Sequence, residues 1–270
     1  MSAGGAGGEA KGGYPPNTII GIGAAGGLLG IYLAHFLSGI NPAFSFLGGI
    51  GAICAIVWGA DAVRRVASYG LGTGVPSIGM IALGMGIVAA LFGLSVGGIA
   101  GPIVSFIAAA VIGAIIGVLA NKVIGMGIPI MERAMVEIAG AGTLAIIGLS
   151  TVIAGSFEYG AVIENVVSTG FIAMIFIIGG MGILHPFNAN LGPDEKQDRT
   201  LSVAVEKASL AMIISGIASS INEGMGAAIV TVLVGLAIWY MAFNKYYGFV
   251  KRDAHAVVGT GLLPSAEELE

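Results

Sequence analysis

The sequence predicts an all-α, polytopic transmembrane helix bundle of about eight spans. Of its 270 residues, 56% are hydrophobic and only 10% are charged, whereas a soluble domain carries about 25% charged residues. Apolar runs recur along the chain at lengths near the roughly 20 residues that a helix needs to cross the hydrocarbon layer. Glycine, with 47 residues, lies inside these runs without a Gly-X-Y period, and such small residues let transmembrane helices approach closely.

Segments rich in turn-forming and helix-breaking residues separate the apolar runs. The predicted spans are residues 17–38, 43–61, 76–95, 99–121, 137–156, 162–184, 203–221 and 225–247. The seventh is the weakest, because Glu206 and Lys207 fall inside it. The first run is too long for the core of a signal peptide and predicts an uncleaved helix. Around this domain, residues 17–247, we expect a flexible, Gly-rich cytoplasmic tail at 1–16 and a cytoplasmic tail at 248–270.

The basic residues give the predicted bundle an orientation. With eight spans, all eleven fall on one side: Lys11, Arg64, Arg65, Lys122, Arg133, Lys196, Arg199, Lys207, Lys245, Lys251 and Arg252. Because cytoplasmic loops of membrane proteins carry the excess of Lys and Arg, both termini are predicted to face the cytoplasm. Omitting the seventh span would move the last three of these residues to the outside, so we retain it.

Several polar residues stand near the predicted inner ends of spans. Asp61 precedes Arg64 and Arg65 by three and four residues, so it can pair with both along one helical face while they mark a cytoplasmic turn. Glu137 opens the fifth span, where we expect the helix dipole to stabilise its charge. The two tryptophans are expected to be anchors at the membrane interface: Trp58 and Trp239.

Two glycine patterns suggest how the helices pack. The turn at residues 72–76, Gly-Thr-Gly-Val-Pro, resembles Gly-Met-Gly-Ile-Pro at 125–129. The pair indicates either a repeated helical hairpin or two unrelated helix starts, in which glycine allows a tight backbone and proline suits the first turn. Small residues also recur at about fourth-residue spacing and predict close helix crossings. These are Gly23, Gly27, Gly30, Ala109, Gly113 and Gly117.

The sequence gives no support to several functional classes. The net charge is −4 and no long basic run is present, which argues against nucleic-acid binding. The single cysteine, Cys54, lies in an apolar run and is expected to serve packing. We find no sequence constellation for catalysis, metal binding or dinucleotide binding, so we expect no chemistry on this chain alone.

Polar groups on the predicted outer side are the candidate site residues. Glu158, Glu164, Glu223 and Asn222 stand there without a basic residue nearby. Oxygen ligands suit a hard cation such as Na⁺, so these four could line a sodium path; the alternative is that they are solvated loop residues. Glu164 is the best placed, near the start of the sixth span. The centres of the spans otherwise hold almost only Gly, Ala, Ile, Leu and Met.

Three stretches carry a resemblance to a known family. They are GGYPPNTIIGIGAAGGLLGIYLAHFL, RRVASYGLGTGVPSIGM and NKYYGFVKRDAHAVVG. Together with the rest of the chain, they resemble the C subunit of the tetrahydromethanopterin S-methyltransferase of methanogenic archaea. The resemblance covers essentially the whole sequence and does not depend on a short catalytic motif.

The resemblance implies a membrane complex that transfers a methyl group from methyl-tetrahydromethanopterin to coenzyme M and expels Na⁺. It implies that a corrinoid is carried by another subunit and that this chain, with no cofactor of its own, joins the D and E membrane subunits in the cell membrane. This chain would then be a non-catalytic subunit. Alternatives that the residues leave open are the D or E subunit, a purely structural subunit, and a stand-alone transporter or channel.

Overall fold

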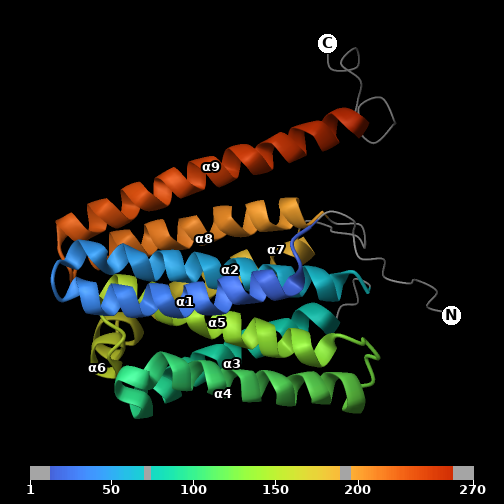
Figure 1. Cartoon of the computed structure of the whole chain (residues 1–270), viewed down its shortest axis with the longest axis horizontal. Helices are drawn as coiled ribbons and strands as arrows, with labels where there is room; N and C mark the ends of the chain where they lie inside the picture. The colour runs from blue at the N-terminus through green and yellow to red at the C-terminus, as the bar shows by residue number, and fades with distance from the viewer. Residues whose placement is uncertain (1–12, 70–73, 189–195, 258–270) are drawn as a thin grey trace.

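The computed structural model describes residues 13–69, 74–188 and 196–257, and within these ranges the regular structure is helical throughout (Figure 1). The longer helices are α1 (Pro16–Ser38), α2 (Phe46–Ala67), α3 (Gly74–Gly97), α4 (Gly101–Val118), α5 (Met131–Ala154), α7 (Phe171–Asn188), α8 (Gln197–Ser219) and α9 (Met225–Val257). Short segments join them: η1 (Pro42–Ser45), η2 (Gly98–Ala100), η3 (Leu119–Val123), α6 (Tyr159–Val162) and η4 (Ile163–Val167). The all-α prediction is confirmed.

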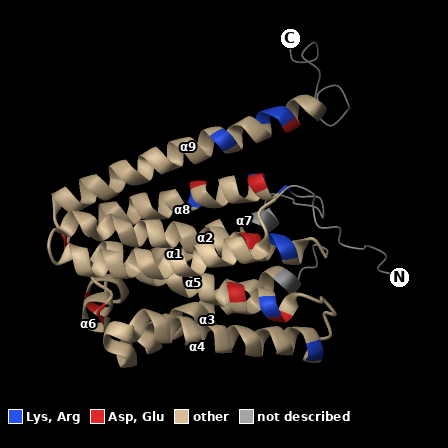
Figure 2. Cartoon of the chain, in the orientation of Figure 1, with Lys and Arg blue, Asp and Glu red and all other residues tan. Residues whose placement is uncertain are grey.

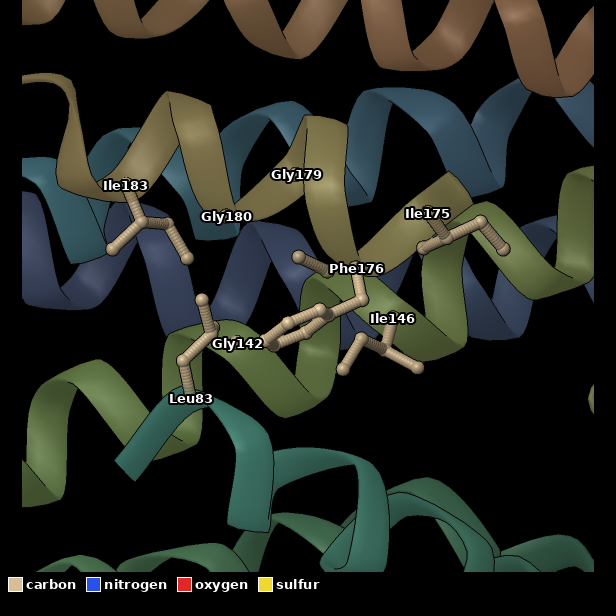
Figure 3. Close-up of a pocket in the computed structure, with 9 residues that line it drawn as sticks. Leu83, Gly142, Ile146, Ile175, Phe176, Gly179, Gly180 and Ile183 are labelled. Atoms are coloured by element: carbon tan, nitrogen blue, oxygen red, sulfur yellow. The ribbon is translucent and has the colours of Figure 1, made fainter. Parts of the chain in front are cut away.

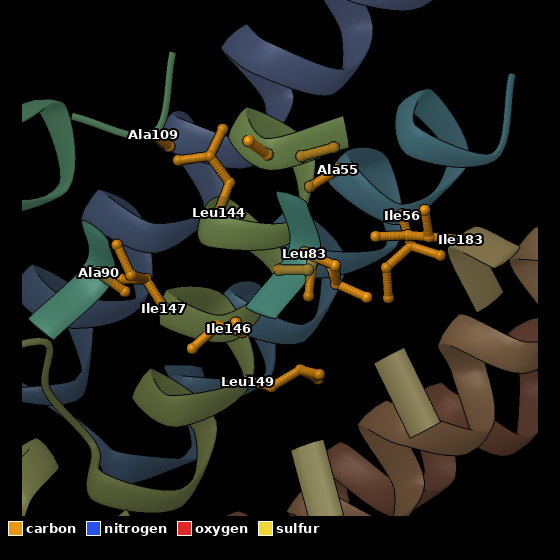
Figure 4. Packing of buried hydrophobic residues seen from close by; sticks show 14 of the residues in the cluster. Ala55, Ile56, Leu83, Ala90, Ala109, Leu144, Ile146, Ile147, Leu149 and Ile183 are labelled. Carbon is orange, nitrogen blue, oxygen red and sulfur yellow. The ribbon is translucent and has the colours of Figure 1, made fainter. Parts of the chain in front are cut away.

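Helix α5 forms the centre of the bundle. It contacts α1, α2, α3, α4, α7 and α8, and every residue from Glu137 to its end at Ala154 is buried. Figure 4 shows Leu144, Ile147 and Leu149 of α5 surrounded by side chains from neighbouring helices, among them Leu83 of α3 and Ile56 of α2. A helix that is apolar on every face belongs in the interior of a bundle, so the composition of α5 explains its position.

Glycines bring the helix backbones close together at several crossings. A Cβ atom at Gly48 would lie 2.6 Å from the carbonyl oxygen of Gly148, and a Cβ at Gly148 would lie 2.6 Å from that of Gly48. Similarly, Gly30 meets the backbone of Gly51, and Gly113 meets the backbone of Met135. The predicted small-residue stripes therefore serve crossings within this chain, as expected for small residues in membrane helices.

By length and composition, six helical stretches could cross a membrane, or seven if the bent pair 159–167 and 171–185 is one span. One of the six, Pro76–Val123, has 48 residues and folds back at η2, so that α3 and α4 lie side by side (Figure 1). The Ser105 hydroxyl of α4 donates to the carbonyl of Ala90 on α3 at 3.0 Å. Each predicted span thus overlaps one of the longer helices. The number of membrane crossings and the side of the membrane on which the termini lie stay predictions.

The sixth predicted span is not one straight helix. Residues 159–167 form a short helical segment at 87° to α7. The break follows Val167 and includes Gly170, whose φ of 81° favours glycine. The prediction of a continuous span at 162–184 is therefore wrong, and Glu164 lies in the bent segment before α7.

The two similar Gly-Pro turns differ in structure. Pro76 lies in the first turn of α3, as predicted, but Pro129 lies two residues before α5 begins at Met131. Gly125 and Gly127 have positive φ values of 79° and 66°, whereas residues 70–73 of the first turn lie outside the described ranges. The hairpins that precede the two turns, α1 with α2 and α3 with α4, both pack closely, whereas α4 packs along α5 and α2 scarcely contacts α3. The repeated hairpin therefore stays a prediction.

Helix α9 forms one edge of the bundle (Figure 1). It packs mainly on α8 and η1 and runs to Val257, ten residues beyond the predicted span end at residue 247. Near the end of α9, Asp253 pairs with Arg199 of α8 at 2.7 Å. This ion pair connects the extension of α9 to the start of α8.

Candidate functional site

Basic residues gather at one end of the bundle. Figure 2 shows the blue segments of α2, α4, α5 and α9, with red segments among them, toward the end of the molecule at which α5 begins, and red segments without blue ones at the opposite end near α6. Of the eleven basic residues, Lys11 lies outside the described ranges. The structure thus reproduces the charge asymmetry on which the predicted orientation depends, and we call the basic end the inner end.

Asp61 lies completely buried at the inner end of α2. Its Oδ1 accepts from Nε and Nη2 of Arg64, both at 3.1 Å, and its Oδ2 accepts from Nε of Arg65 at 3.0 Å. The predicted pairing along one helical face is confirmed. The predicted turn at Arg64 and Arg65 is wrong, because α2 continues through both to Ala67; the pairs at three- and four-residue spacing stabilise this last turn.

Glu137 of α5 joins the same network. Its Oε1 accepts from Nε of Arg133 at 2.9 Å, its Oε2 accepts from the Trp58 indole N–H at 2.9 Å, and Arg65 bridges both oxygens. The prediction that Glu137 opens a helix is wrong, because α5 begins six residues earlier at Met131. Trp58 is likewise buried against the carboxylate and is not the expected interface anchor.

The network also holds the start of the described chain. The Gln197 side chain donates to Asp61 Oδ1 at 3.0 Å and to the carbonyl of Tyr14 at 3.1 Å, and it accepts from the Tyr14 N–H at 2.6 Å. Arg133 donates to Asn17 at 3.1 Å. These contacts connect α1, α2, α5 and α8, and the oxygens of both carboxylates are hydrogen-bonded, as buried charges require.

The four candidate sodium-path residues lie at the outer end. Glu158, Glu164 and Asn222 are exposed, whereas Glu223 is half-buried. Asn222 donates to the carbonyl of Ile153 at 3.4 Å. The Glu223 carboxylate lies against Gly155, where a Cβ atom would be 2.4 Å from it.

The chain therefore brings Asn222 and Glu223 to the C-terminal end of α5, with Glu158 three residues beyond Gly155. Burial raises the pKa of the Glu223 carboxyl group. His35 of α1 also lies at this end, where its Nδ1 is hydrogen-bonded to the Ser156 hydroxyl at 3.0 Å. Sodium binding by the four residues stays a prediction.

A second charged group lies midway along α8. Glu206 is 5% exposed; its Oε1 accepts from the Trp239 indole N–H at 3.0 Å, and its Oε2 lies 2.9 Å from Lys207 Nζ. Trp239 is therefore a partner of a buried carboxylate as well as an aromatic residue of α9. Because α8 begins at Gln197, Glu206 and Lys207 lie near the middle of the helix, and the prediction of uncharged span centres is wrong there.

Comparison with known proteins places the chain. The family described as the C subunit of tetrahydromethanopterin S-methyltransferase matches residues 1–267. The chain belongs to this family. Proteins described as the same subunit include one from Methanosarcina acetivorans, 80% identical over the full length of both chains, and one from Methanosarcina mazei, 73% identical, also over the full length of both. One from Methanothermobacter thermautotrophicus is 43% identical, with 97% of this chain and 98% of that protein covered.

Membership of the C-subunit family confirms the resemblance and identifies the chain with the C subunit of a methyltransferase complex, in preference to the D and E subunits. The relatives extend along the whole sequence, so the described helices all lie within the matched region. The other subunits of the complex are consequently partners of this chain.

The C subunit is tightly packed where α3, α5 and α7 meet. A crevice of about 10 Å³ lies between α3, α5 and α7, and Leu83, Gly142, Ile146, Phe176 and Gly180 are among the residues that line it (Figure 3). It is close to the volume of one water molecule, but its apolar lining lacks the polar partners that water needs. Across the same ranges, no three His, Cys, Asp or Glu side chains come together as metal ligands.

Sequence reasoning missed two features of the site. The partnership of Glu137 with Arg65 joins residues 72 positions apart, and nothing in local spacing indicates it. The position of Glu206 in the middle of a helix has a signal in the sequence, because the charged pair Glu206 and Lys207 interrupts an apolar run. A helix that starts at Gln197, as α8 does, places this pair near its middle.

Proposed function

We propose that this chain is an integral-membrane subunit of the complex that transfers a methyl group from methyl-tetrahydromethanopterin to coenzyme M and translocates Na⁺. In this proposal, the chain contributes to the sodium-translocating part in the cell membrane and takes no part in methyl chemistry. The D and E subunits are its membrane neighbours, a corrinoid is carried by another subunit, and Na⁺ is the coupling ion.

The observation that carries the proposal is the full-length match to the C subunit of a methyltransferase in a chain built from long apolar helices. A bundle with a central helix buried on every face is suited to a membrane and leaves the reacting groups to other subunits. The basic inner end supplies charges for contact with cytoplasmic subunits, since complementary charge favours association.

In this proposal, the outer carboxylates form the entrance for sodium. Glu158, Glu164, Glu223 and Asn222 present oxygen atoms at the acidic end of the bundle, and a surface of one charge sign raises the local concentration of its counter-ion. Glu223 is the most enclosed of them, beside the C-terminal end of α5. A helix C-terminus carries partial negative charge, which adds to the attraction for a cation.

The purified complex in liposomes tests this function. We expect ²²Na⁺ uptake that depends on methyl-tetrahydromethanopterin and coenzyme M, and no uptake by vesicles that contain only this chain. Methyl transfer without any ²²Na⁺ movement would contradict the sodium role.

A second candidate is that this subunit transports Na⁺ without help from its partners, because Glu206 and Lys207 place a buried charged pair midway along a helix, and transporters bind their ions at such groups within the membrane. Vesicles that contain the chain alone distinguish the two. Uptake of ²²Na⁺ by those vesicles would favour transport by this subunit alone and exclude a role that needs the complex.

A further inference from the structure

We propose that Glu206, together with Lys207 and His185, forms an intramembrane cation-exchange site, at which the Lys207 ammonium group and Na⁺ compete for one carboxylate oxygen. The inference rests on the proposed sodium function. It assigns the exchange step to this chain and places it deeper than the outer carboxylates.

The position of Glu206 is the first argument. It is the tenth of the 23 residues of α8, so it lies about 13 Å from the inner start of the helix and about 20 Å from its outer end at 1.5 Å per residue. In Figure 2, a red and a blue segment lie along the middle of α8, where the ribbons of the neighbouring helices are tan. In the predicted span 203–221, Glu206 is the fourth residue, and ionisable groups buried inside a membrane bundle are rare and mark ion pathways by default.

Incomplete hydrogen bonding is the second argument. The buried carboxylates at the inner end, Asp61 and Glu137, have partners on every oxygen, which explains them as structural groups. Glu206 differs, because its buried Oε2 has no hydrogen-bond partner in the part of the chain that the structure describes. Lys207 Nζ lies 2.9 Å from it but outside hydrogen-bond geometry, so the ammonium balances the charge while leaving acceptor capacity on Oε2 for another cation.

The partial exposure of Lys207 allows its ammonium group to move away from Glu206. The Lys207 stem lies beside Gly182 of α7, where a Cβ atom would be in ordinary van der Waals contact with the Cβ of Lys207 at 3.6 Å. The Lys207 side chain is 26% exposed, against 6% for Glu206. A long amphipathic side chain can keep its stem in the apolar layer while its charged end moves toward water.

His185 lies on the route of the displaced ammonium. It is three residues nearer the inner end of α7 than Gly182, and its Nε2 is buried with no hydrogen-bond partner among the described residues. The charges of Lys207, Glu206 and Arg199 all act on this imidazole. In the tautomer protonated on Nδ1, Nε2 is an acceptor for the Lys207 ammonium.

The exchange keeps a cation beside Oε2 at every stage. With Lys207 on Oε2, the pair is neutral; when Na⁺ enters with its remaining water, the site gains one positive charge, and the partly exposed Lys207 carries that charge past His185 toward water at the inner end. Trp239 holds Oε1 throughout through its N–H. The carboxylate is therefore never left buried without a cation, a state whose cost would be prohibitive.

The test uses the assembled complex in liposomes and the initial rate of ²²Na⁺ uptake. Glu206→Gln keeps the size of the side chain and an acceptor for Trp239 but removes the charge, so we expect uptake to fall at least about tenfold, as loss of a group at an ion site does. Glu132→Gln is the matched control, because Glu132 is 40% exposed and pairs with the exposed Lys122; we expect it to stay within about twofold of the unmodified complex.

The outcomes separate the two proposals. Absence of uptake by the unmodified complex would refute the sodium function itself. Uptake by unmodified complex and by Glu206→Gln at equal rates, with equal amounts of assembled complex, would overturn only the exchange site.

The Lys207→Met variant tests the exchange site if the Glu206→Gln complex fails to assemble. Methionine keeps an apolar stem and removes the competing ammonium, so the Na⁺ concentration for half-maximal uptake should fall at least about threefold, as expected when a competing cation is removed from a carboxylate. An unchanged Na⁺ dependence in this variant would overturn the exchange site.

Discussion

At the residue scale, the chain places buried carboxylates in two kinds of environment. Asp61 and Glu137 are saturated with arginine, tryptophan and glutamine donors, whereas Glu206 has a single hydrogen bond and an ammonium neighbour. The first arrangement stabilises one geometry, because moving any one partner leaves a buried polar group without a hydrogen bond. In the second arrangement, either the Lys207 ammonium or another cation can bind the free carboxylate oxygen.

Glu137→Gln tests the structural network. The substitution leaves Arg65 and Arg133 beside a neutral amide, and breaking a buried ion pair costs about 3–5 kcal/mol of unfolding free energy. Glu132→Gln, at the exposed pair with Lys122, should cost no more than about 1 kcal/mol. Unfolding of the chain in mixed detergent micelles, followed by far-ultraviolet circular dichroism, measures both, and equal effects would contradict a network role for Glu137.

Glu223→Gln tests the environment of the outer carboxylate. Burial raises the pKa of Glu223 in the folded chain, so the Glu223 carboxylate binds a proton more tightly in the folded state than in the unfolded state. The resulting stabilisation is present at low pH and is lost as the pH rises through the raised pKa. The melting temperature of the unmodified chain should thus fall relative to Glu223→Gln as pH rises, and a constant difference between them would show that Glu223 is simply solvated.

The sequence predicts residue pairs well only where they are close along the chain. The spacing of Asp61, Arg64 and Arg65 predicted their contacts, which lie within one helical turn. The partner of Glu206 is 33 residues away on α9, and the Gln197 contact with Asp61 spans 136 residues. Such partners depend on which helices become neighbours, which local spacing does not specify.

At the element scale, the crossing of α2 and α5 holds the bundle together. Gly48 and Gly148 each lack the side-chain atom that would lie 2.6 Å from the carbonyl oxygen of the other. A glycine in a helix interior costs conformational entropy, and the close approach of two central helices offsets it through packing. The loss of either glycine would push α2 and α5 apart.

Gly148→Ala tests this crossing. The added methyl group meets backbone that cannot rotate away, so we expect a loss of about 1–3 kcal/mol of unfolding free energy, typical of an overpacked core. Gly84→Ala on α3 is the control, because a methyl group there would have nothing within 4 Å, and alanine should be neutral or stabilise by up to about 1 kcal/mol. The same unfolding assay in micelles applies; a neutral Gly148→Ala would contradict the close crossing.

Helices are better predicted than the breaks between them. The length of the apolar runs predicted a helix at every span, because a backbone in a bilayer must satisfy its own hydrogen bonds. The bend at residues 168–170 escaped prediction, since Ser, Thr and Gly also occur inside membrane helices, and the 87° turn depends on tertiary packing.

At the scale of the whole molecule, one asymmetry supports both functional proposals. The basic end carries the saturated network, and the acidic end carries the candidate sodium entrance (Figure 2). Under the positive-inside rule, the basic end faces the cytoplasm. Sodium that enters at the outer carboxylates and exchanges at Glu206 would then follow one line through α8 and its neighbours.

Cysteine accessibility in oriented membrane vesicles tests this arrangement most directly. In a Cys54→Ala background, which removes the single cysteine, we expect a membrane-impermeant maleimide to label Lys11→Cys and Lys251→Cys only from the cytoplasmic face, and Glu158→Cys and Asn222→Cys only from the outer face. Labelling of positions 11 and 251 from opposite faces would give an odd number of crossings and contradict the account.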